Sequence, residues 1–303
     1  MADYLAGRWE PAAAGLAGAE ELLTDRCTGV MWELDSARSF SMGAQYWLGN
    51  FRRLAERFPA LAKDAHDRGD IYASTQIGTF LAHLVLLSAG DAVAASRHAK
   101  EAMTRWPQDG VQMPHLWEFM SIVHIALYTR RGREAWELAC RFWPALKYSL
   151  LLEVQLMRIL MLDLRGRAAI AAAGQVPVGT DRERCLADAL RCAQQMHKQR
   201  TQWGKPIALI IEAGVHYCSQ RNDEALRCLE GAQRSADAHR MQMIAAVARR
   251  RRGDLIGGSE GFALVAASEA WMRAEGITDP PAMAIMFAPW QPAASTRSSM
   301  AAE

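Results

Sequence analysis

The sequence lacks the short motifs by which most nucleotide-dependent enzymes are identified. It has no glycine-rich phosphate loop ahead of a helix, no GxxxxGK[ST] sequence and none of the HRD, DFG or strand-lysine motifs of a kinase catalytic domain. Its eight histidines include no HExxH and no other tight metal-ligand spacing. The sequence alone therefore predicts no catalytic residue, no metal site and no cofactor.

Other absences narrow the class of protein. The six cysteines form no CxxC pair and fall mostly inside helical patterns, which is typical of buried thiols in a reducing compartment. No apolar run is long enough to span a membrane and no basic-then-apolar signal opens the chain, so we expect a cytoplasmic protein without a membrane partner. The net charge of only +2 argues against nucleic acid as a partner.

Strict polar–apolar alternation, the mark of a half-buried strand, is missing too, and apolar positions recur at helical spacing instead. Glycines that close helical segments recur at a nearly constant interval, at Gly7, Gly49, Gly90, Gly132 and Gly174. A fixed period of this kind is typical of stacked helix pairs. The predicted fold is all-α, a TPR-like right-handed superhelix of helix pairs with a repeat period of about 42 residues.

We expect residues 1–289 to form this repeat domain and residues 290–303 to be a disordered tail. Segment 9–23 follows Gly7 and resembles the second helix of a pair, so the first repeat lacks its first helix. Its apolar face would then be uncovered, which predicts fraying or a dimer through the N-terminal repeat. The further predicted helices span residues 30–48, 50–68, 71–88, 91–105, 113–130, 133–146, 149–173, 182–200, 236–252 and 260–275.

Polar residues recur at one phase of the repeat. They lie eleven or fourteen residues before the junction glycines, three apart on one helix face, at Asp35, Arg38, Gln76, Thr79, Glu118, Ser121 and Asp163. In two-helix solenoids the first helices line the concave surface, which commonly binds partners. We expect this polar column to bind a partner there, with a solvated outer stripe or an internal hydrogen-bond ladder as the alternatives. His83, His115 and His124 are interpreted as ordinary helix residues.

Several segments resemble the C-terminal helical region of large bacterial eukaryotic-type serine/threonine protein kinases. These are residues 32–38 (WELDSAR), 68–74 (RGDIYAS), 105–110 (RWPQDG), 141–146 (RFWPAL), 270–277 (AWMRAEGI) and 279–283 (DPPAM). In those proteins a kinase domain, often with a regulatory ATPase-like segment, precedes TPR-like repeats. The resemblance covers residues 4–289 and implies a TPR-like interaction or sensor region. It implies no kinase activity here, because every catalytic motif is absent, and it assigns no functional residue.

The expected function is therefore a non-catalytic scaffold or sensor in serine/threonine-kinase-linked bacterial signalling. Its expected partner is a protein or peptide, with a kinase domain or its substrate as the candidate. Two alternatives stay open. In the first, the chain is a C-terminal fragment of a serine/threonine kinase, and an in-frame kinase domain upstream would support this. In the second, the chain is a helical-repeat regulator that senses a small molecule, and a thermal-shift screen against metabolites would detect the binding of that molecule.

Overall fold

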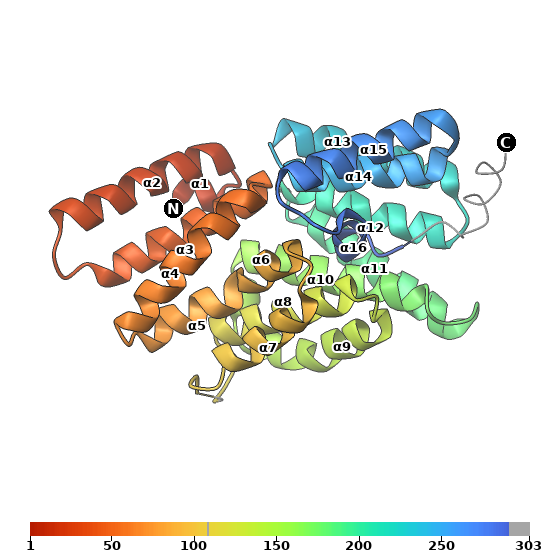
Figure 1. Cartoon of the computed structure of the whole chain (residues 1–303). Coiled ribbons are helices and arrows are strands. Elements are labelled where there is room, and N and C mark those ends of the chain that lie inside the picture. Colours follow the sequence, from red (N-terminus) through yellow and green to blue (C-terminus); the bar gives the residue numbers. More distant parts are fainter. Residues whose placement is uncertain (108, 291–303) are drawn as a thin grey trace.

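The computed structural model describes residues 1–107 and 109–290. Within these ranges the chain is entirely helical and contains no strand, which confirms the predicted all-α class. Helices that follow each other along the chain pack as neighbours, most closely α2 with α3, α10 with α11, α12 with α13 and α14 with α15 (Figure 1). Most of the predicted disordered tail, residues 291–303, lies outside the described residues. Trp290, its predicted first residue, is buried.

The elements have the following bounds: α1 (Ala2–Leu5), α2 (Trp9–Arg26), α3 (Met31–Leu48), α4 (Phe51–Asp67), α5 (Ile71–Phe80), α6 (Ala82–Ser88), α7 (Ala92–Ala102), α8 (Met113–Tyr128), α9 (Gly132–Tyr148), η1 (Leu151–Glu153), α10 (Gln155–Ala173), α11 (Thr180–Lys198), α12 (Gly204–Cys218), α13 (Asn222–Ala238), α14 (Gln242–Ile256), α15 (Gly258–Ala274) and α16 (Pro280–Phe287).

The first three junction glycines have the predicted conformation. Gly7 has φ of +74°, and Gly49 and Gly90 both have φ of +84°, the left-handed conformation that ends a helix without steric cost to glycine. The next two do not. Gly132 is the first residue of α9, and the left-handed residue at that junction is Arg130, with φ of +61°. Gly174 has φ of −73°. The structure therefore does not confirm the predicted repeat period.

Three helix boundaries differ from the prediction. The segment 71–88 is divided at Leu81, two residues after Thr79, whose hydroxyl donates to the Thr75 carbonyl and so competes with the helical ladder. The helix expected from residue 149 begins only at Gln155, because Leu150 is left-handed and a 3-10 turn follows it. The helix expected over 236–252 is α14, which begins at Gln242.

The apolar face of α2 is covered over the first half of the helix, where Trp9, Ala12 and Leu16 are buried. Trp9 is 1% exposed; its ring stacks on Trp47 at a centroid distance of 5.1 Å and meets Trp203 edge-on at 5.5 Å. The short helix α1 lies beside it, and its Tyr4 packs against Gly43, where an added Cβ atom would overlap the Tyr4 hydroxyl. The start of α2 is therefore covered, whereas Leu22 near its end is 54% exposed, and dimerisation itself stays a prediction.

The two ends of the helical array meet, and the last helix lies between them. Arg240 pairs with Glu10 of α2, and the guanidinium group of Arg52, in α4, donates to the Ala274 carbonyl at the end of α15. Helix α16 then turns into the middle of the molecule, where it contacts α8, α14 and α15 (Figure 1). Contacts between residues far apart in the sequence thus fix the overall arrangement.

Among the residues that the structure describes, one segment, Ile71–Ser88, is long and apolar enough to cross a membrane by length and composition. In the fold it is divided at Leu81, and 56% of it is buried inside the molecule, as in a core helix of a soluble protein. The absence of a membrane partner and a cytoplasmic location both stay predictions.

Candidate functional site

Three of the predicted binding residues, Thr79, Ser121 and Asp163, lie in a buried hydrogen-bond ladder between helices. Ser121 Oγ is 2.8 Å from the Thr79 carbonyl oxygen and 2.9 Å from His83 Nδ1. Thr79 and Ser121 have no exposed surface, and Asp163 is buried in α10. In this conformation none of the three offers a surface to a partner, so this part of the column is an internal ladder.

The ladder continues through two histidines to a buried ion pair. His83 Nε2 lies 2.9 Å from His124 Nδ1, and His124 Nε2 lies 3.0 Å from Arg167 Nη2. The same arginine contacts the Asp163 carboxylate one helical turn earlier. His83 and His124 are thus members of a network that connects α6, α8 and α10, rather than ordinary helix residues.

The guanidinium group fixes the direction of each proton in this ladder. Arginine can only donate, so His124 Nε2 accepts and the His124 proton must sit on Nδ1. That proton is donated to His83 Nε2, which places the His83 proton on Nδ1. His83 then donates to the Ser121 oxygen, and the Ser121 hydroxyl donates to the Thr79 carbonyl. Both imidazoles are neutral in this arrangement.

Burial keeps both rings neutral. It lowers the pKa of His83 to about 3. It also lowers the pKa of His124 well below its usual value, and the Arg167 charge lowers that pKa further. Burial raises the pKa of Asp163, an effect that the neighbouring arginine opposes. With its atoms sealed from solvent, the ladder determines how the helices pack and offers no group to a substrate.

A second polar cluster connects α2, α3 and α4. The predicted pair of Asp35 and Arg38 is present, with 3.7 Å between Oδ1 and Nη1. Arg68 holds the Asp35 carboxylate through both of its terminal nitrogens, at 2.9 and 3.2 Å, and Arg38 lies 2.7 Å from Asp64. Each of these charges is compensated by a neighbour, so the cluster stabilises the helices without a ligand.

An apolar groove of about 360 Å³ opens between α1, α3, α5, α8 and the start of α10, and we call it the aromatic groove. The rings of Trp32 and Tyr72 lie 4.9 Å apart on its wall. Trp32 is 62% exposed, which is unusual for so large an apolar side chain. The other aromatic residues that line the groove are Tyr4, Phe40, Phe80 and Trp117.

Two residues of the predicted column, Asp35 and Gln76, line this groove. Gln76 Oε1 and Trp117 Nε1 are buried and have no hydrogen-bond partner among the described residues. An unpaired buried polar atom costs about 1–3 kcal/mol, and the wall of the groove contains one such acceptor and one such donor.

Glu118, the last member of the column, is half-buried on α8, and burial raises the pKa of its carboxyl group. The structure therefore does not bring the seven predicted side chains onto one surface. Two line the aromatic groove, three lie in the ladder, and Arg38 and Glu118 lie elsewhere. Whether any of them binds a partner stays a prediction. The sequence analysis did not select the groove's aromatic residues, and only some of them share a signal: Trp32 and Tyr72 are the second residues of α3 and α5.

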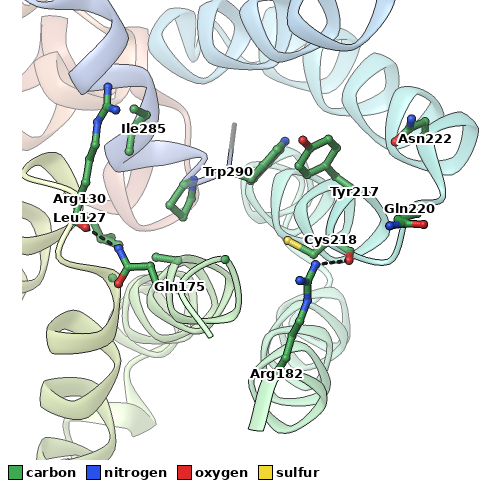
Figure 2. Close-up of a pocket in the computed structure, with 14 residues that line it drawn as sticks. Leu127, Arg130, Gln175, Arg182, Tyr217, Cys218, Gln220, Asn222, Ile285 and Trp290 are labelled. Carbon is green, nitrogen blue, oxygen red and sulfur yellow. Dashed lines mark hydrogen bonds between the residues drawn. The ribbon is translucent and has the colours of Figure 1, made fainter. Parts of the chain in front are cut away.

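A larger cavity, of about 670 Å³, lies where α8, α10 and α12 end (Figure 2). Several of its polar side chains form hydrogen bonds with backbone groups at the ends of helices. Gln175 donates to the Arg130 carbonyl and accepts from the Arg133 amide, and Arg182 donates to the Cys218 carbonyl at 2.6 Å. Figure 2 shows Arg182 reaching that carbonyl below Tyr217. These contacts hold neighbouring helix turns together, so the aromatic groove is the better candidate site.

Within residues 1–107 and 109–290, no group of three or more His, Cys, Asp or Glu side chains is placed to hold a metal ion. No protein-family model, no curated protein and no solved structure matches this chain. Its function must therefore be argued from its own residues.

Proposed function

We propose that this chain is a TPR-like helical-repeat module that binds a protein or peptide partner in the aromatic groove, without catalysis. In this proposal the helix pairs form a right-handed superhelix, and α3, α5, α8 and α10 line its inner surface. The observation that carries the proposal is the exposed Trp32 ring beside Tyr72 at an apolar groove. Exposed tryptophan and tyrosine side chains beside apolar pockets are enriched among the residues that dominate binding energy.

The groove's unpaired atoms support a peptide as the occupant. A peptide chain offers an amide donor and a carbonyl acceptor at every residue, which complements Gln76 Oε1 and Trp117 Nε1. Its apolar side chains would pack on the aromatic walls. The charge of Asp35 is already compensated by Arg68, so the occupant needs no matching cation there.

The link to bacterial signalling rests on the resemblance of this chain to the helical regions of serine/threonine kinases. In this account the partner is a kinase domain or its substrate. A small-molecule ligand is the second candidate, since a volume of about 360 Å³ lies within the range of ligand pockets. A thermal-shift screen against metabolites distinguishes the two, because only a sensor gains stability from a small compound.

Selection from a library of random twelve-residue peptides displayed on phage tests the proposal. Wild-type protein should enrich a family of related sequences that contain apolar or aromatic side chains. The variant Trp32→Ala/Tyr72→Ala should fail to retain those phage. The control Tyr148→Ala removes a side chain that is 89% exposed on α9, away from the groove, and should retain them. Equal retention by all three proteins would contradict the proposal.

A further inference from the structure

The segment 280–290 occupies the middle of the helical array and is held there as a ligand is held. It comprises α16, which Figure 1 shows among the other helices, and the three residues after it, and residues 282–290 are all buried. It contacts α8, α14 and α15, which surround it from distant parts of the sequence. We call the space that it fills the central groove.

Two buried arginines donate hydrogen bonds to main-chain carbonyls of this segment. Arg167 Nη1, from α10, donates to the Met286 carbonyl at 3.0 Å. Arg251 Nη2, from α14, donates to the Ala288 carbonyl at 2.6 Å. The two arginines are 2% and 1% exposed. Because a carbonyl oxygen is common to every residue type, these bonds recognise a backbone course rather than a particular sequence.

Two aromatic side chains supply the specificity. The Phe287 ring lies 5.4 Å below the Arg167 guanidinium group and stacks on Tyr46 at 6.5 Å. The Trp290 ring lies 5.6 Å from the Arg251 guanidinium group. Gly214 makes room for it, since a Cβ atom there would lie 2.8 Å from the Trp290 ring. The central groove therefore has two positions that hold an aromatic ring. The two rings come from residues three apart in the sequence, and each lies against a guanidinium group.

Burying two guanidinium groups is costly unless each is paired and hydrogen-bonded. Asp163 and Asp254 pair with them, and the carbonyls of segment 280–290 complete the arrangement. Even so, the Nε atoms of both arginines have no partner within the described chain. The last carbonyls of a buried helix have no intrahelical donor, and here two arginines from other helices supply it, so the segment is bound through its main chain as a peptide is bound.

We propose that the central groove is a peptide-binding site that this chain's own segment 280–290 fills. The partner it fits is a segment with a short apolar helix followed by two aromatic side chains three residues apart. Such a partner displaces segment 280–290, and the two arginines then hold its main-chain carbonyls. This inference does not depend on the aromatic groove, so either can fail without the other.

The test uses a fluorescein-labelled synthetic peptide with the sequence of residues 279–290 and the full chain. A segment attached to its own site acts at an effective concentration in the millimolar range, so the wild type should bind the peptide weakly. The variant Phe287→Ala/Trp290→Ala weakens the attached segment and leaves the groove intact. It should bind the peptide at least about tenfold more tightly in fluorescence anisotropy. A control peptide with alanine at both aromatic positions should not bind.

A folded variant that binds neither peptide, or binds both equally, would overturn the proposal. If the variant does not fold, hydrogen exchange of the wild type decides. A ligand-like segment opens on its own, so the amides of residues 283–288 should exchange at a lower free energy than global unfolding. Exchange of these amides only through global unfolding would show that the segment is an inseparable part of the core.

Discussion

The Nε2 atom of His83 lies 2.9 Å from the Nδ1 atom of His124, and both rings are sealed inside the helical array. The Arg167 guanidinium group beyond them can only donate, so the bond between the rings has one direction and both rings are neutral. The stability of the fold should therefore depend on pH in a predictable way.

Between about pH 3 and pH 6.5 the His83 ring is neutral in the folded chain and protonated in the unfolded chain, and the lowered pKa of His124 acts in the same direction. Unfolding then takes up protons, so stability is full above pH 6.5 and falls as the pH drops below it. His83 should contribute a slope of up to about 1.4 kcal/mol per pH unit in this range, and His124 a slope of the same sign. Urea unfolding at several pH values measures it. The variant His83→Gln/His124→Gln should lose this part of the slope, and His66→Gln, on the exposed face of α4, should not.

Ser121 should be important for stability although its side chain is small. In Ser121→Ala the His83 Nδ1 proton loses its acceptor inside the core, which costs about 1–3 kcal/mol. The control Thr104→Ala removes an exposed hydroxyl whose only described bond is local, and it should cost under about 0.5 kcal/mol. Equal urea midpoints for the two variants would show that the ladder adds nothing to stability.

The sequence predicted that these polar positions align between neighbouring helices, but not that their side chains face the interior. Ser121 does contact the corresponding position of the preceding first helix, at Thr79, and His124 meets His83 at nearly the same separation along the chain. The spacing that suggested a column therefore corresponds to real contacts. Residues of α8 and α10 are buried on nearly every side, however, so polar positions there face neighbouring helices instead of solvent. Periodicity along one helix cannot reveal how many neighbours cover it.

Helix ends were predictable where local chemistry decides them. Asp91 accepts from the Ala94 amide at 2.8 Å, as its position before a helix predicts, and Gly90 before it is left-handed. The closure of the array was not predictable, because Trp9 and Trp203 meet although they lie far apart in the sequence. The same holds for the central position of α16 and for the aromatic groove, which five separate elements build.

Gly90→Val should destabilise the fold by about 1 kcal/mol or more. Gly90 has φ of +84°, and a Cβ atom there would lie 2.8 Å from the Thr278 hydroxyl, which holds the turn before α16. The control Gly15→Val lies within α2 with open space around it and should change stability by less than about 0.5 kcal/mol. An unchanged midpoint for Gly90→Val would contradict the assignment of this junction.

Gly214→Ala should disturb the packing of the Trp290 ring and destabilise the fold. The added Cβ atom would lie 2.8 Å from both the Trp290 ring and Ile170 Cδ1, and such overpacking typically costs about 1–3 kcal/mol. The control Gly231→Ala, in the interior of α13, meets only the flexible end of Leu209, at 3.3 Å, and should stabilise the helix by about 0.5–1 kcal/mol. Thermal unfolding compares the two. A Gly214→Ala variant as stable as the control would show that the space beside the Trp290 ring can hold the added methyl group.

Calorimetric titration of a phage-selected peptide into the full chain tests the central claim, that the aromatic groove binds a peptide partner. The account predicts one saturable site in the wild type and in Tyr148→Ala. It predicts binding at least about tenfold weaker, or about 1.4 kcal/mol, in Trp32→Ala/Tyr72→Ala, because those two rings form the exposed wall of the groove. Equal affinity for all three proteins would contradict it.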